Sequence, residues 1–146
     1  MQDTDVSEIW NRLLSTPIQL MTEQERIVHA VNVFWIDFQQ GGWLYNVAPR
    51  DETGYRHWAH LRGVAVAVAA IGATGVAERL TKIAAIVERV PEGRDDGTWG
   101  GFLESVDPQD CISALEREIN TELGTLYELL EAYTVAQLPN SASGDQ

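Results

Sequence analysis

Apolar residues recur along most of the chain at the three- and four-residue spacing of amphipathic helices. This pattern predicts a short helix over residues 5–15 and a longer helix from Thr22 to about Gln40. The start of the longer helix has the sequence of a capping box, in which Thr22 and Glu25 each accept a backbone N–H. Gly41-Gly42 is expected to end it. Its apolar face is predicted to comprise Ile27, Val31, Phe34, Trp35 and Phe38.

Two helices are predicted in the middle of the chain, over residues 55–71 and 74–90. The alternation from Val64 to Val68 also suits a strand, but the helical spacing of the flanking apolar residues and the many alanines favour a helix. Gly72 separates the two predicted helices, and Pro91 follows the second one. A glycine-rich loop is expected over residues 91–101.

The C-terminal third has the most regular apolar spacing of the chain. Asp107-Pro108 is a typical helix start, with aspartate as N-cap and proline at the first helical position. The pattern predicts one helix from Pro108 to about Leu138, which would be roughly 45 Å long. We therefore expect an all-α single domain over residues 1–138, a bundle of five to six helices ending in one long acidic helix, and a disordered polar tail over 139–146. The apolar residues of that last helix are Ile112, Leu115, Ile119, Leu123, Leu126, Leu130 and Tyr133.

Negative charge is concentrated in the same third of the chain. The 146 residues contain 22 acidic and 10 basic side chains, which gives a net charge of −12. Residues 92–146 hold 12 of the acids and only Arg94 and Arg117 as bases, so this part accounts for −10. Such a charge excludes direct binding to nucleic acid or to an anionic membrane surface, and it suits a basic protein partner. The 45% hydrophobic content is that of a globular domain.

The predicted last helix carries acids along its whole length, and we interpret them as candidate partner-binding residues. Carboxylates spaced about 5 Å apart along a helix approach the density of one phosphate per ~3.4 Å on a DNA strand. An alternative is that the acids form a solvated face that serves only solubility. The candidate residues are Asp107, Asp110, Glu116, Glu118, Glu122, Glu128 and Glu131.

Motifs for catalysis, metal binding or cofactor binding do not occur in the sequence. The spacing of Glu25 and His29, and of His57 and His60, matches no di-metal or His-Glu-x-x-His pattern, so we expect no metal site. Cys111 is expected to be a small, half-buried apolar residue rather than a nucleophile. No phosphate-binding loop or nucleophile elbow is present, so we expect no cofactor and no enzymatic activity.

Nothing in the sequence suggests secretion or membrane insertion. The first residues lack the basic and apolar regions of a signal peptide, and the longest apolar stretch, residues 64–77, is too short to cross a bilayer. A single cysteine excludes an intramolecular disulfide, which fits a reducing compartment. We therefore expect a cytoplasmic protein.

Three short segments resemble a bacterial all-helical family of mostly uncharacterised proteins that includes a DNA-mimic protein. These segments are Met21 to Arg26, the turn Gln40-Gly41-Gly42-Trp43 with Tyr45 nearby, and the helix junction Ala69 to Ala73. The turn departs from the family pattern, which has asparagine at the position of Gln40 and phenylalanine at that of Trp43. Its residues Gly41, Gly42, Trp43 and Tyr45 are interpreted as structural. The resemblance covers roughly residues 21–90, so the acidic third lies outside it.

The resemblance and the charge together favour an acidic interaction protein. It would occupy the basic surface of a DNA-binding regulator or a nuclease, as a DNA mimic does. One alternative is an immunity-type inhibitor of a toxin enzyme, which uses the same electrostatics. Another is a small-molecule-binding domain or enzyme built around Trp43, Tyr45, His57 and His60. The sequence leaves open whether the chain also forms a homodimer.

Overall fold

All regular structure is helical in the part of the chain that the structure describes. The computed structural model describes residues 6–39, 59–88, 107 and 109–138. The prediction of an all-α fold is confirmed for these residues. The elements are α1 (Val6–Leu14), the 3-10 helix η1 (Ile18–Leu20), α2 (Glu23–Gln39), α4 (Ala59–Ala70), α5 (Thr74–Val87), α7 (Cys111–Asn120) and α8 (Leu123–Gln137).

The predicted capping box defines the start of α2. The backbone N–H of Thr22 donates to Glu25 Oε1 at 2.9 Å, and the N–H of Glu25 donates to Thr22 Oγ1 at 3.1 Å. Arg12 of α1 also reaches Glu25 Oε2, at 3.5 Å. Glu25 is buried, and the two donors that reach its carboxylate, the Thr22 N–H and the Arg12 guanidinium, compensate for its loss of hydration.

Helices α4 and α5 form an antiparallel pair that turns at Gly72. Gly72 has a φ of 99°, which a residue with a side chain rarely adopts. Its N–H donates to the carbonyl of Ala69, and the N–H of Ala73 donates to the carbonyl of Val68 at 3.1 Å, as in a Schellman motif. The alternating valines and alanines from Val64 to Val68 lie inside α4, so the choice of helix over strand is confirmed.

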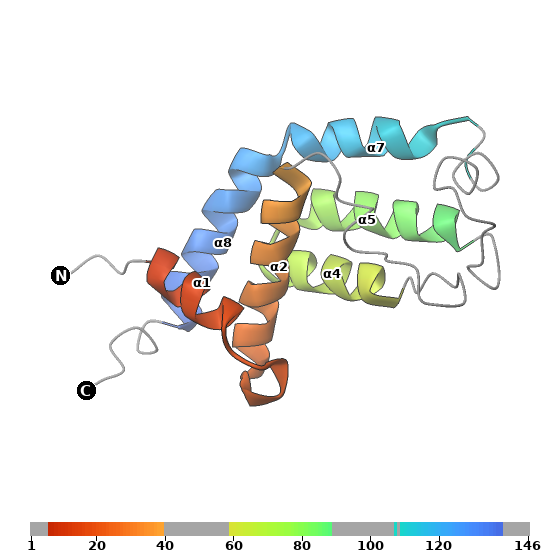
Figure 1. Ribbon diagram of the computed structural model, residues 1–146. Coiled ribbons are helices and arrows are strands. Elements are labelled where there is room, and N and C mark those ends of the chain that lie inside the picture. Colours follow the sequence, from red (N-terminus) through yellow and green to blue (C-terminus); the bar gives the residue numbers. More distant parts are fainter. Residues whose placement is uncertain (1–5, 40–58, 89–106, 108, 139–146) are drawn as a thin grey trace, which may run out of the picture.

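The helices pack in two directions around one core. Helix α5 lies between α4 and α7, while α2 crosses α4 and runs beside α8 (Figure 1). Helix α1 covers one end of the pair formed by α2 and α8. Every α-helix contributes to the core, whereas η1 has no buried residue. Fully buried side chains include Ile9, Leu13, Val28, Val31, Phe34, Leu61, Leu80, Ile83, Ile119, Leu126 and Leu130.

A buried polar contact joins α1 to α8. The indole N–H of Trp10 donates to Thr134 Oγ1 at 3.0 Å, and the Thr134 hydroxyl donates to the carbonyl of Leu130 at 2.7 Å. The rings of Trp10 and Tyr127 also pack in a T-shaped arrangement, with centroids 5.6 Å apart. Both polar groups are therefore satisfied in the core, where an unpaired donor would be costly.

The prediction of one long C-terminal helix is wrong, because the chain bends at Thr121 and Glu122. Helix α7 ends at Asn120 and α8 begins at Leu123, and the two point in different directions (Figure 1). At the bend the N–H of Glu122 donates to the carbonyl of Ile119, and the Thr121 hydroxyl donates to that of Glu118 at 2.7 Å. A threonine hydroxyl that bonds a nearby carbonyl is a recognised cause of helix bending.

The sequence pattern does not reveal this bend, because the three- and four-residue spacing of the apolar residues continues across it without interruption. Ile119 and Leu126 are both buried, on opposite sides of the break. The signals that indicate it are local: Asn120-Thr121 and Gly124 all favour helix weakly. The loop at residues 91–101, the polar tail and the helix stop at Gly41-Gly42 lie outside the described residues.

Candidate acidic interaction surface

The structure divides the seven acids predicted to bind a partner into groups with different surroundings. Asp107 and Asp110 precede α7, Glu116 and Glu118 lie on α7, Glu122 lies at the bend, and Glu128 and Glu131 lie on α8. Because the two helices diverge, these acids do not follow one straight axis (Figure 1). Each group therefore has to be assessed separately.

Asp107 acts as a structural cap. Its Oδ1 accepts the N–H of Cys111 at 2.8 Å and its Oδ2 accepts the N–H of Ile112 at 2.7 Å. The residue is 7% exposed. Sequence reasoning identified its capping role, but α7 begins at Cys111, three residues later than the predicted start. Both carboxylate oxygens bind the first turn of α7, so Asp107 does not belong to the exposed acidic set.

Glu118 and Glu122 are paired with a cation that sequence reasoning missed. Arg79 of α5 donates from Nε to Glu118 Oε1 and from Nη1 to Glu122 Oε2, both at 2.6 Å. These glutamates lie four residues apart, an arrangement that is repulsive in an isolated helix. In the folded chain one guanidinium serves both of them. Two glutamates four residues apart on a helix were the sequence signal that a basic side chain from another helix lies between them.

Glu116 is the most buried of the acids on α7 itself. Burial raises the pKa of its carboxyl group, and the nearby charge of Asp110 raises it further. Both effects disfavour the charged form. A cationic partner that approaches Glu116 would therefore relieve an existing electrostatic cost.

Three of the predicted acids remain exposed and without an ion-pair partner among the described residues: Asp110, Glu128 and Glu131. Asp110 has a left-handed backbone with φ 59° at the N-cap of α7, and its side chain makes no capping bond. Glu128 and Glu131 are one turn apart on the outer face of α8. The chain has no lysine or arginine after Arg117, so no base follows on α8.

Other acidic side chains lie on different faces of the bundle. Glu8, Glu23 and Glu78 are exposed on α1, α2 and α5. Glu88 at the end of α5 is instead held by Arg62 of α4, with three hydrogen bonds at 2.7, 2.9 and 3.3 Å. Burial raises the pKa of Asp37 on α2. Negative charge therefore extends beyond the C-terminal helices, contrary to a surface confined to them.

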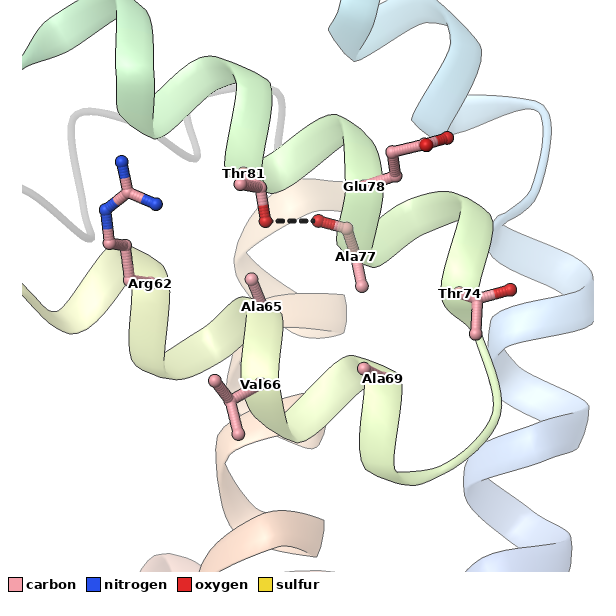
Figure 2. A pocket seen from close by; sticks show the side chains of 8 residues that line it. All are labelled: Arg62, Ala65, Val66, Ala69, Thr74, Ala77, Glu78 and Thr81. Carbon is pink, nitrogen blue, oxygen red and sulfur yellow. Dashed lines mark hydrogen bonds between the residues drawn. The ribbon is translucent and has the colours of Figure 1, made fainter.

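A shallow groove of about 390 Å³ runs between α4 and α5 (Figure 2). Small side chains line most of it, and Val66 stands beside it with 70% exposure. The Thr81 hydroxyl donates to the carbonyl of Ala77 at 2.9 Å, so this polar group is already satisfied. Among the polar side chains that line the groove, Arg62 is already paired with Glu88. The groove is lined by Arg62, Ala65, Val66, Ala69, Thr74, Ala77, Glu78 and Thr81.

The other candidate residues give no assembled chemical site within the described part. The turn residues Gly41, Gly42, Trp43 and Tyr45, together with His57, fall outside the described residues, and nothing is established about the side chain of His60. Cys111 is exposed, so the expectation of a half-buried cysteine is wrong. Burial lowers the pKa of His29, whose Nδ1 is buried and has no hydrogen-bond partner among the residues that the structure describes.

Residues 6–39, 59–88, 107 and 109–138 contain neither a candidate metal site nor a candidate membrane span. No group of three or more His, Cys, Asp or Glu side chains in these ranges could hold a metal ion. No helix among them is long and apolar enough to cross a bilayer.

Fold and charge define the class as an acidic, all-α protein whose exposed carboxylates lie on several helices. The model of the DMP19-like protein family matches residues 19–137, which is most of the chain. The chain therefore belongs to the DMP19-like family. The expected resemblance to an all-helical family that includes a DNA mimic is confirmed.

The match also extends the resemblance. It was expected to end near Val90, but the family model continues through α7 and α8 to Gln137. The acidic helices are therefore part of the family's domain. Comparison with curated proteins and with solved structures finds no match.

Proposed function

We propose that this protein is a non-enzymatic DNA mimic that occupies the basic surface of a DNA-binding protein. The family name stands for DNA mimic protein 19. The observation that carries the proposal is that Asp110, Glu128 and Glu131 are exposed without an ion-pair partner among the described residues, on helices inside the family match. Carboxylates that meet no base within the chain are free to meet the lysines and arginines that a partner uses for phosphates.

The electrostatics of the exposed set suit this role. Charged side chains at a surface contribute chiefly to the rate and specificity of association, because they steer an oppositely charged partner. The net charge of −12 supplies such long-range attraction for a basic protein. We place the action of the protein in the cytoplasm, where its single cysteine stays reduced and DNA-binding proteins are its neighbours.

A competition experiment tests the proposal. A native cell extract is passed over immobilised duplex DNA, and bound proteins are eluted with the purified chain. Each eluted protein is then purified, and displacement of a fluorescent duplex from it is followed by anisotropy. We expect displacement that weakens steeply between about 50 and 300 mM salt. An eluted toxin enzyme whose activity the chain blocks would instead favour the immunity-type alternative, and displacement that is independent of salt would refute the proposal.

Matched variants locate the surface. Asp110→Asn, Glu128→Gln and Glu131→Gln together reduce the negative charge by three, and we expect affinity to fall on the order of tenfold or more. The control combines Glu8→Gln, Glu23→Gln and Glu78→Gln, which remove the same charge from α1, α2 and α5. Equal losses in the two triple variants would show that net charge, not this surface, governs binding.

A further inference from the structure

Arg79 connects the two sides of the bend between α7 and α8. It projects from α5, and its guanidinium bonds Glu118 in the last turn of α7 and Glu122 at the N-cap of α8, each at 2.6 Å. Its side chain is 26% exposed. A rigid planar fork that bonds two groups at once fixes their relative geometry better than a single flexible contact.

Gly75 provides the space for this ion-pair cluster. A Cβ atom at Gly75 would lie 3.0 Å from Arg79 Nη1 and 3.1 Å from Glu122 Oε1. Those distances are shorter than ordinary van der Waals contacts, so any side chain there would push the guanidinium or the carboxylate away. Gly75 lies in the first turn of α5, one turn before Arg79.

The cluster has a clear electrostatic basis. The hydrogen bond from Arg79 to Glu118 and the charges of Glu122 and Glu78 raise the pKa of Arg79. The guanidinium therefore remains charged at every physiological pH. Without the Arg79 guanidinium, the carboxylates of Glu118 and Glu122 would repel each other, because they lie one helical turn apart. This repulsion would act at the bend between α7 and α8. Removing Arg79 therefore changes the forces on the bend itself.

We propose that Arg79 is a positioning residue that sets the angle between α7 and α8, and with it the separation of the acids on the two helices. Asp110 and Glu116 belong to the α7 side of the bend, and Glu128 and Glu131 to the α8 side. The consequence for binding rests on the proposed function, whereas the geometric role of Arg79 does not. Glu118 and Glu122 then serve mainly to hold Arg79 rather than the partner.

The angle can be measured without any partner. Cys111 is exposed at the start of α7 and is the only cysteine, so Ala132→Cys on the exposed face of α8 creates a single pair for spin labelling. Double electron–electron resonance spectroscopy then gives the distribution of distances between the two spin labels. We expect Arg79→Gln to shift and broaden this distribution relative to the parent. An unchanged distribution would overturn the proposal.

Arg62→Gln is the matched control for this measurement. It removes a second arginine that forms an ion pair, and it also changes the net charge from −12 to −13, but Arg62 joins α4 to Glu88 on α5 and bonds neither α7 nor α8. We expect its label distances to match the parent. If both variants shifted them equally, a general effect of charge would replace the positioning role.

Two further variants keep the proposal testable if Arg79→Gln folds poorly. Arg79→Lys retains the charge but not the fork, so we expect a shift smaller than that of Arg79→Gln. Gly75→Ala disturbs the cluster without any change in charge, whereas Gly63→Ala adds a methyl group that meets nothing within 4 Å. A shift with Gly75→Ala but not with Gly63→Ala supports the proposal, and identical distances in these two variants contradict it.

Binding to the DNA-binding protein recovered above separates the two proposals. If net charge alone governed binding, Arg79→Gln and Arg62→Gln would both bind a basic partner slightly more tightly than the parent protein does. Positioning predicts that Arg79→Gln binds several-fold more weakly despite its additional net negative charge. If no partner is recovered, the proposed function fails while the label distances still decide the role of Arg79.

Discussion

At the scale of single residues, carboxylates that look alike in the sequence have different roles because their surroundings differ. Asp107 bonds two backbone N–H groups, Glu118 and Glu122 bond Arg79, and Glu131 bonds no described residue. Glu116 has no ion-pair partner among the described residues and is partly removed from water. Its charged form therefore reduces the stability of the fold.

The pH dependence of Glu116→Gln follows from that environment. Because the folded-state pKa of Glu116 is raised above its ordinary value of 4.5, the folded protein binds its proton more tightly than the unfolded chain. Its contribution to stability is therefore largest at pH values below 4.5 and is lost as pH rises through the folded pKa. Glu116→Gln should raise Tm at pH 7, by about 1–2 °C, and leave it unchanged near pH 4.

Glu128→Gln is the control, since it removes the same charge from an exposed position on α8. Thermal unfolding of the two variants and the parent over a pH series provides the comparison. An equal rise in Tm at pH 7 in both variants would show that the stabilisation comes from reduced overall charge repulsion and not from the burial of Glu116.

At the scale of elements, short-range signals determined helix ends more reliably than apolar spacing did. The capping box of α2 and Gly72 after α4 both act as predicted, because each bonds neighbouring backbone groups. The bend between α7 and α8 was missed, because Thr121 and Glu122 interrupt the helix without changing the spacing of the apolar residues on either side. Helix spacing reports which side of a segment is buried, and it is insensitive to a change of direction that preserves the buried side.

Capping by Asp107 is the testable consequence at this scale. Asp107→Ala leaves two N–H groups of α7 without their acceptor, so the free energy of unfolding should fall by about 1–2 kcal/mol. Urea titration followed by circular dichroism measures the change. Glu131→Ala on the exposed face of α8 is the control and should change stability by less than about 0.5 kcal/mol. A loss no larger than the control's would contradict the capping role.

At the scale of the whole molecule, the excess of negative charge opposes folding while it favours a cationic partner. Long-range repulsion within a chain of net charge −12 destabilises the compact state and is screened by salt. Only a few arginines pair with acids among the described residues, so screening should relieve more repulsion than it weakens attraction.

We therefore expect Tm to rise by a few degrees as sodium chloride increases from about 10 to 200 mM, which spans the range in which the Debye length shortens most. Differential scanning calorimetry measures the change. The variant that combines Glu78→Gln, Glu128→Gln and Glu131→Gln has a net charge of −9, and its rise in Tm should be smaller. A Tm that falls with salt would show that ion pairs outweigh the repulsion.

The sequence by itself determined the helical class, most helix boundaries and the buried faces, because spacing, caps and glycines act through neighbours in the chain. It also placed Glu116, Glu118, Glu128 and Glu131 on helices. Only the tertiary structure decided which acids are available. Arg79 lies 39 and 43 residues before the two glutamates it bonds, and the burial of Glu116 depends on packing between helices. Charge is a property of a residue, whereas its pairing and exposure depend on which distant segments the fold brings beside it.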